Sequence, residues 1–291
     1  MGQRRAPLVR VTSLVVLAAG RARRYGGIKP LAPIGADGEA VIDLLAGDAL
    51  RAGFASIVLV VNPDTGPQIR EHVAGAWPSG VDVAFCVQER PIGTVDAVLA
   101  ARGSVDPSTP FGVANADDLY GADALSVLGR HLEATGTNGL VAFRLDRALV
   151  GDLPVTRGVC EVADGALAGI TERRGVVRRD GAFHVDDGEA PSVLDDATLV
   201  SMNLWGFDPG MWGVLAEAMA AAHGASEDDE VLLPELVARV VAAGGPHARF
   251  EVLSTTSRCL GVTHADDLAL VRGEIEGEIA RGERPRAAFP D

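Results

Sequence analysis

Cysteine is scarce in this chain of 291 residues, and its three cysteines, Cys86, Cys160 and Cys259, lie far apart. An odd number of widely spaced cysteines excludes a disulfide framework and a zinc site of the Cys-x-x-Cys type. A chain of this kind is typical of a reducing compartment, so we expect a cytoplasmic protein. No hydrophobic run approaches the length of a membrane span, and the apolar stretch at 14–19 is too short for the core of a signal peptide.

Basic residues are in the minority: 26 Lys and Arg stand against 40 Asp and Glu, which gives a net charge of -14. This balance disfavours a nucleic-acid partner, which normally requires an extended basic face. The six histidines show no ligand spacing, and the Gly-x-Gly-x-x-Gly fingerprint of dinucleotide-binding oxidoreductases is absent. There is also no internal repeat and no long polar tract, so we expect one globular domain over 1–291.

The hydrophobic pattern indicates an α/β fold with three layers, in which a mainly parallel but mixed central sheet carries helices on both faces. In the first half, strands are expected at 14–18, 56–61, 81–87, 111–114 and 139–144, with helices at 41–52, 68–74, 94–102 and 122–134. In the second half, strands are expected at 157–162, 166–172, 199–207 and 249–253, with helices at 209–222, 230–243 and 265–281. The strands at 157–172 and 199–207 are expected to form one wall of a cleft.

A basic loop follows the first expected strand. The segment 14–30 reads LVVLAAGRARRYGGIKP and carries Arg21, Arg23, Arg24 and Lys29 with no acidic residue. Small residues let backbone N–H groups approach phosphate oxygens, and the cations offset the phosphate charge. In an acidic protein this loop predicts a local polyphosphate site; a surface turn with solvated arginines is the alternative.

An acidic loop follows the strand expected at 111–114. It reads NADDLYG and places Asp117 and Asp118 at a strand end, where α/β sheets bind their ligands. Adjacent carboxylates repel each other unless a cation lies between them, and beside phosphates that cation is usually Mg²⁺. The alternative is that one of the two aspartates caps the helix expected to begin near Ala122.

A third loop, QERPIGTVDAV at 88–98, combines the amide of Gln88 with a turn at Gly93 and with Thr94 at an expected helix N-cap. An amide can read the edge of a nucleobase by complementary hydrogen bonds, and glycine permits close approach. The alternative is a turn with an N-cap and no ligand. Gln88 favours a pyrimidine, although an amide also serves guanine.

These pieces occur together in one family. The segment LAAGRARRYGGIKPLAPIG resembles the signature of sugar-1-phosphate nucleotidyltransferases. GTVDAVLAA, the Asp pair, VSMNLWGFDP at 200–209, EVLLPELV at 230–237 and GVTHADDL at 261–268 follow in the family's order, so the resemblance covers nearly the whole chain. It implies a Rossmann-like nucleotidyltransferase fold of the GT-A type, with a nucleotide-binding half at 1–150 and an acceptor-binding half at 151–291.

The resemblance also implies roles for individual residues in the nucleotide half. Arg24 matches the arginine that holds the triphosphate, Lys29 the lysine that balances charge during transfer, and Asp117 the metal-binding aspartate. These three are the implied catalytic residues, and Mg²⁺ is the implied cofactor. The implied nucleotide contacts are Leu17, Ala18, Ala19, Gly20, Gln88, Gly93, Thr94 and Asp118.

In the second half, Glu172 and Arg173 in ITERR match acceptor-contacting positions of the family. Ser201 stands where an asparagine often contacts the sugar, and Asn203 stands where glycine is usual. We therefore expect these four residues to bind the acceptor, in a sugar pocket that is not an ordinary one.

Three departures concern phosphate and metal binding. The loop has Ala22 where the family has glycine and Arg23 where threonine is common. The second metal ligand is expected at Thr263, whose hydroxyl is a poor substitute for a carboxylate, and Asp266 is close by but shifted.

The resemblance implies transfer of a nucleoside monophosphate from a nucleoside triphosphate to a sugar 1-phosphate or sugar-like phosphate, with release of pyrophosphate. Two alternatives remain open. A glycosyltransferase of GT-A type also holds a metal on a nucleotide sugar, and a non-catalytic nucleotide-binding regulatory protein could keep the fold without the chemistry. The identities of the base and the acceptor are open as well, and the acceptor could be a cyclitol phosphate.

Overall fold

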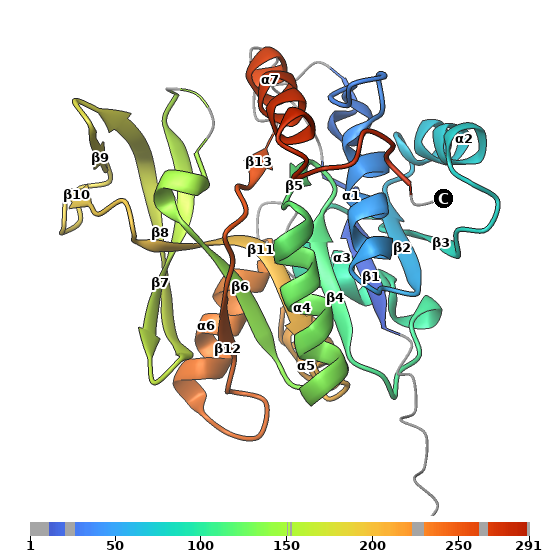
Figure 1. The fold of residues 1–291 in the computed structure, drawn as a ribbon. Helices are drawn as coiled ribbons and strands as arrows, with labels where there is room; N and C mark the ends of the chain where they lie inside the picture. Colours follow the sequence, from blue (N-terminus) through green and yellow to red (C-terminus); the bar gives the residue numbers. More distant parts are fainter. Residues whose placement is uncertain are drawn as a thin grey trace, which may run out of the picture.

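Figure 1 shows the computed structural model, which describes residues 12–20, 27–149, 151, 153–222, 230–261 and 267–289. Within these residues, eleven strands form one sheet, and β5 and β13 pair in a second, two-stranded sheet. The strands of the large sheet are β1 (Ser13–Leu17), β2 (Ser56–Val61), β3 (Val83–Val87), β4 (Phe111–Asn115), β6 (Gly139–Arg144), β7 (Val155–Ala163), β8 (Ala166–Arg179), β9 (Ala182–His184), β10 (Val193–Leu194), β11 (Leu199–Phe207) and β12 (Glu251–Ser254).

The four strands β3, β2, β1 and β4 lie side by side in that order and are all parallel. Their sequences are rich in valine, isoleucine and leucine, which pack well in strands that are covered on both faces. Parallel strands end at the same edge of a sheet, so the loops that follow these strands meet there.

The other half of the sheet is mixed. β11 lies antiparallel between β4 and β6, and β12 is parallel to β6. β7 and β8 form an antiparallel hairpin, and β7 also pairs with β11. β9 and β10 extend this hairpin at the end of the sheet, on the left of Figure 1.

Side chains alternate along β1 and divide the core into two layers. Leu14 and Val16 pack with α1 (Val41–Arg51), α2 (Gly66–Ala76) and α4 (Ala122–Thr135). Val15 and Leu17 pack on the opposite face with α3 (Thr94–Ala100), α5 (Met211–Ala221) and α6 (Leu233–Ala243). The predicted three-layer α/β fold is therefore confirmed, and no helix within the described residues is both long and apolar enough to cross a membrane.

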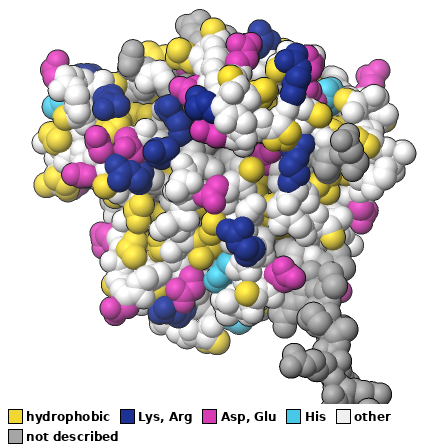
Figure 2. Space-filling model, in the orientation of Figure 1, with side chains coloured by type: hydrophobic (Ala, Val, Ile, Leu, Met, Phe, Trp, Pro, Cys, Tyr) yellow, Lys and Arg dark blue, Asp and Glu magenta, His cyan; other side chains and the backbone are white. Residues whose placement is uncertain are grey.

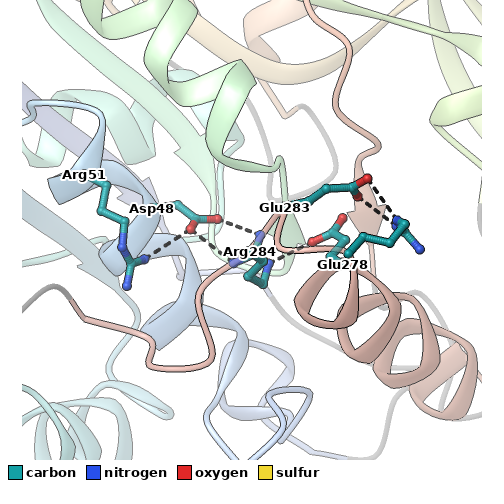
Figure 3. A network of polar contacts seen from close by, with 6 residues as sticks. Asp48, Arg51, Glu278, Glu283 and Arg284 are labelled. Atoms are coloured by element: carbon teal, nitrogen blue, oxygen red, sulfur yellow. Dashed lines mark hydrogen bonds and ion pairs between the residues drawn. The ribbon is translucent and has the colours of Figure 1, made fainter.

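A buried ion-pair network ties the C-terminal segment to α1 (Figure 3). Arg284 follows α7 (Asp267–Ala280) and donates to both carboxylate oxygens of Asp48 in α1, at 3.1 and 2.8 Å. Its Nε also donates to Glu278 of α7 at 2.8 Å. The chain then runs over α1 and α2, where Phe289 packs against Trp77 with the ring centroids 5.4 Å apart. The network therefore fixes α7 and the C-terminal segment against the first half of the fold.

The structure differs from the sequence prediction mainly in short elements. The two-residue strands β5 (Asp118–Leu119) and β13 (Leu260–Gly261) were not predicted, nor were β9 and β10. Three single-turn 3-10 helices, η1 (Lys29–Leu31), η2 (Arg102–Ser104) and η3 (Leu145–Arg147), were also missed. β8 runs to Arg179, seven residues beyond its predicted end at 172.

Candidate active site

The loops after β1, β3 and β4 begin at one edge of the sheet, each with a backbone hydrogen bond to a neighbouring strand. Ala18 N–H donates to Val60 O at 2.7 Å, and Gln88 N–H donates to Val61 O at 2.8 Å. Ala116 N–H donates to Leu17 O at 3.1 Å. These bonds place the start of the basic loop between the Gln88 loop and the acidic turn.

Lys29 and Asp117 face each other at this edge. Lys29 begins η1, Asp117 lies in the turn between β4 and β5, and Lys29 Nζ is 3.5 Å from Asp117 Oδ2. The two side chains are 18% and 37% exposed, so both are accessible to a ligand. The structure thus brings together the cation and the carboxylate that the sequence predicted in two separate ligand-binding loops.

Lys29 is also the only lysine in the chain. An ammonium group is a compact point charge with three donors, whereas the arginine guanidinium is a wide planar fork. A chain that otherwise relies on arginine for permanent positive charge therefore has its single ammonium side chain beside Asp117. This compositional signal in the sequence marks Lys29 independently of any motif.

Asp118 is held by its neighbours. Asn115 Nδ2 donates to Asp118 Oδ2 at 2.9 Å, and β13 pairs Gly261 with Asp118. Burial of the carboxylate and the adjacent charge of Asp117 raise the pKa of Asp118 to about 7. A Cβ at position 261 would lie 2.6 Å from Asp118 Oδ1, so glycine is required there for this carboxylate to keep its position.

The alternative that Asp117 or Asp118 caps the next helix is wrong. α4 begins at Ala122 and its N-cap is Gly121, with φ +78° and no side-chain cap. Both aspartates are therefore available for another role.

A first cavity of about 120 Å³ opens beside the basic loop. The expected residues Ala19 and Gln88 line it, together with Asn62, which sequence reasoning missed. Asn62 follows β2, and its Nδ2 donates to Ala19 O at 3.0 Å, which fixes the start of the basic loop. A polar residue at the carboxyl end of a parallel strand was the signal that could have identified it.

The amide of Gln88 has a fixed orientation. Its Nε2 donates to Gly93 O and to Asp96 Oδ2, each at 3.0 Å. Because both partners are acceptors, the NH₂ group points toward α3, and Oε1 is the atom left to accept a hydrogen bond.

Gly93 and Thr94 make close contacts with the 230–233 segment of the same chain. Gly93 has φ +100°, and a Cβ there would lie 2.3 Å from Val231 O, so the backbone that approaches this glycine belongs to the 230–233 segment. The predicted N-cap is corrected as well: Gly93 is the N-cap of α3, whereas Thr94 Oγ1 accepts from Leu233 N–H at the start of α6, at 2.8 Å.

A second cavity of about 240 Å³ lies between the two halves of the sheet. Of the residues expected to bind the acceptor or the nucleotide, five line it: Thr94, Asp118, Glu172, Ser201 and Asn203. The β7–β8 hairpin contributes to its wall, as the sequence predicted. The cavity borders Asp118 and therefore begins next to the Lys29–Asp117 pair.

Asn203 lies at an irregularity of β11. Its φ is +60°, in the left-handed region that asparagine tolerates better than most side chains and glycine best of all. Its N–H donates to Ser201 Oγ at 3.2 Å, and its Oδ1 accepts from Trp205 Nε1 at 3.1 Å. The glycine that is usual at this position in the family agrees with this backbone conformation.

Arg173 is engaged away from the second cavity. Its guanidinium forms a bidentate pair with Asp187 at 2.6 and 3.1 Å and also donates to Glu189 O and Pro191 O. The side chain is only 4% exposed. Arg173 therefore anchors the 187–191 loop to β8 and is absent from the cavity lining.

Arg157 of β7, which sequence reasoning missed, lines the second cavity instead. Its Nε and Nη2 donate to Ala148 O at 3.2 and 2.8 Å, and its Nη1 donates to Thr156 O at 2.9 Å. Burial lowers the pKa of Arg157, and the nearby charge of Asp118 opposes this effect. An arginine within an expected strand gave little signal in the sequence, because its inward orientation depends on the loop that carries Ala148.

Some expected residues lie outside the described part of the chain. They are Arg21, Ala22, Arg23 and Arg24 of the basic loop, and Thr263 and Asp266 after β13.

Comparison with known proteins agrees with this fold. Residues 14–150 match the family described as the MobA-like NTP transferase domain. The inositol-1-phosphate CTP transferase from T. maritima superposes with a TM-score of 0.65 at 14% identity, over 92% of this chain and 97% of that one. A UDP-glucose pyrophosphorylase in complex with UDP-glucose superposes with a TM-score of 0.63 at 14% identity, over 92% and 99%. No curated protein matches the sequence.

Proposed function

Because residues 14–150 form a MobA-like NTP transferase domain, we propose that this chain is a nucleotidyltransferase that makes a nucleoside diphosphate sugar or a closely similar compound. It transfers a nucleoside monophosphate from a nucleoside triphosphate to a sugar 1-phosphate or sugar-like phosphate and releases pyrophosphate. The Lys29–Asp117 pair carries this proposal, because it sets a cation and a carboxylate at the edge of the sheet where Ala19 lines the first cavity and Asp118 lines the second.

The reaction requires no nucleophile from the protein. An oxygen of the acceptor phosphate is already ionised and attacks the α-phosphorus in line; the new O–P bond forms as the bond to the leaving pyrophosphate breaks. Catalysis then consists of alignment and charge stabilisation. We assign the neutralisation of charge on the pyrophosphate to Lys29 and, in the loop before it, to Arg24.

We propose Mg²⁺ as the cofactor, with Asp117 as its protein ligand. Among the described residues, no three His, Cys, Asp or Glu side chains are placed to hold a metal by themselves. An exposed carboxylate beside a phosphate site nevertheless fits Mg²⁺, which keeps several waters and binds through one or two carboxylates together with substrate phosphates. Mg²⁺ bound there supplies charge neutralisation and a template for the phosphate oxygens. Thr263 remains the proposed second ligand.

The first cavity is the proposed site of the base. Gln88 reads the base through Oε1, since its Nε2 is occupied. Backbone atoms of Leu17, Ala18, Ala19 and Gly20 contact the phosphates and ribose. Gly93 and Thr94 shape the site through their contacts with residues 230–233, and Asp118 borders the ribose and acceptor.

The second cavity is the proposed acceptor site. Glu172, Ser201 and Asn203 offer carboxylate, hydroxyl and amide groups to acceptor hydroxyls. Residues 1–150 thus serve as the nucleotide half and residues 151–291 as the acceptor half of one domain. The three cysteines are free, which agrees with the proposed cytoplasmic location.

The test is a panel of nucleoside triphosphates crossed with sugar 1-phosphates and cyclitol phosphates, in the presence of Mg²⁺, with pyrophosphate release as the readout. The proposal predicts pyrophosphate release that depends on both substrates. Nucleotide binding without pyrophosphate release from any pair would identify a non-catalytic nucleotide-binding protein. Sugar transfer from a nucleotide sugar to an acceptor would identify a glycosyltransferase.

A further inference from the structure

Arg157 is the described arginine that lines the second cavity, and three of its five guanidinium N–H groups donate to backbone carbonyls. These bonds to Ala148 O and Thr156 O hold the guanidinium in place without neutralising its charge, because backbone carbonyls are uncharged. No Asp or Glu of the described residues lies within ion-pair distance of Arg157, whereas Arg173 has a bidentate carboxylate partner.

Neither carboxylate of the cavity lining pairs with Arg157, so its positive charge is available to a ligand. Asp118, which also lines the cavity, forms no ion pair with Arg157 and accepts a hydrogen bond from Asn115 Nδ2 at 2.9 Å. Glu172, the other carboxylate of the cavity lining, accepts a hydrogen bond from Arg174 at 3.0 Å. Arginine side chains also gather over the β7–β9 region on the face shown in Figure 2.

A half-buried guanidinium that is fixed, charged and without a bonded carboxylate is a site for an oxyanion. We propose that Arg157 binds an oxyanion of the acceptor and thereby takes the place of Arg173, which the Asp187 pair withdraws from the cavity. This proposal rests on the proposed function, because it identifies the residue that selects the acceptor. The oxyanion is either the reacting phosphate or a carboxylate on the acceptor ring.

The test measures binding and turnover separately, with the full chain. Calorimetry in the presence of Mg²⁺ and a non-hydrolysable nucleotide analogue gives the Kd for glucose 1-phosphate and for glucuronate 1-phosphate. The variants are Arg157→Gln, Arg157→Lys and, as a matched control, Arg179→Gln at the exposed end of β8. Urea unfolding of each variant shows whether it is folded.

Loss of a charge-assisted hydrogen bond predicts that Arg157→Gln weakens binding about 10- to 100-fold. Arg157→Lys should lose less, because it keeps the charge, and Arg179→Gln should bind like the wild type. An equal loss for both ligands assigns the contact to the phosphate, and a loss confined to glucuronate 1-phosphate assigns it to a carboxylate.

The proposal is overturned if folded Arg157→Gln binds both ligands like the wild type, or if the wild type binds neither of them. Pyrophosphate release by the wild type is recorded in parallel. Binding that depends on Arg157 without any pyrophosphate release would leave this inference standing and contradict the proposed function.

Discussion

Lys29 Nζ lies 3.5 Å from Asp117 Oδ2, so the 3-10 turn after the basic loop and the turn after β4 meet at one edge of the sheet. These residues are 88 positions apart in the sequence, and the parallel pairing of β1 with β4 brings them together. An ammonium and a carboxylate at this separation stabilise each other weakly when exposed. We therefore interpret the pair as a site prepared for phosphate and metal.

The first prediction uses the fact that Lys29 is the only lysine. Pyridoxal 5′-phosphate followed by borohydride should modify one side-chain amine, that of Lys29, in addition to the α-amine. A nucleoside triphosphate with Mg²⁺ should reduce labelling of Lys29, because its phosphates cover Nζ. Peptide mass spectrometry measures both sites, and the α-amine serves as the internal control. Labelling of Lys29 that is unaffected by saturating nucleotide would place the triphosphate elsewhere.

The second prediction concerns Gly261. Gly261→Ala should lower kcat about 10- to 100-fold, because its Cβ would displace the Asp118 carboxylate, whose Oδ1 it would approach to 2.6 Å. Steady-state pyrophosphate release measures the effect. Gly213→Ala in α5 is the matched control: nothing lies within 4 Å of its Cβ, and it should stabilise the protein by up to about 1 kcal/mol at unchanged kcat. Equal rates for the two variants would argue against a role for the position of Asp118.

The third prediction concerns the network of Figure 3. Arg284→Ala should lower the free energy of unfolding by about 3–5 kcal/mol, because it removes both short hydrogen bonds of the buried Asp48 carboxylate and leaves it only the 3.5 Å contact with Arg51. Arg281→Ala removes an exposed pair with Glu283 and should change the free energy of unfolding by less than about 1 kcal/mol. Urea unfolding at neutral pH measures both. A loss below 1 kcal/mol for Arg284→Ala would show that the C-terminal segment contributes little to the fold.

The fourth prediction is a pH dependence at Asp187. The Arg173 hydrogen bond holds the pKa of Asp187 well below its usual value of 3.8. A carboxylate with a lowered pKa in the folded state contributes stability that is fully present above its unfolded pKa and is lost as the pH falls toward the folded pKa. Asp187→Asn should therefore be less stable than the wild type at pH 7, and the difference should shrink below about pH 4. Urea midpoints from pH 7 to pH 3 test this; a constant difference would exclude titration of Asp187 as the cause.

Much of the fold could be predicted because long apolar runs and amphipathic helices depend on local sequence. Ser56–Val61, Gly139–Arg144 and Leu199–Phe207 have the predicted bounds. The strands β5 and β13 could not be predicted, because two-residue strands exist only through pairing of segments about 140 residues apart.

The candidate site likewise contains some contacts that could be predicted from the sequence and others that could not. The proximity of Lys29 and Asp117 could be predicted from the sequence, because loops after parallel strands share one edge of a sheet. The contacts of Arg157 with Ala148 O, of Gly93 with Val231 and of Arg173 with Asp187 could not, since each depends on a partner that only the tertiary structure supplies.

The central claim is that Lys29 and Asp117 act together on a triphosphate bound with its metal, and its most direct test is pyrophosphate release by Asp117→Asn and Lys29→Met at saturating substrates. Each change removes one charge at the reacting phosphates and should lower the rate about 10²- to 10³-fold, with the urea midpoint close to that of the wild type. Rates within twofold of the wild type in either folded variant would contradict the account.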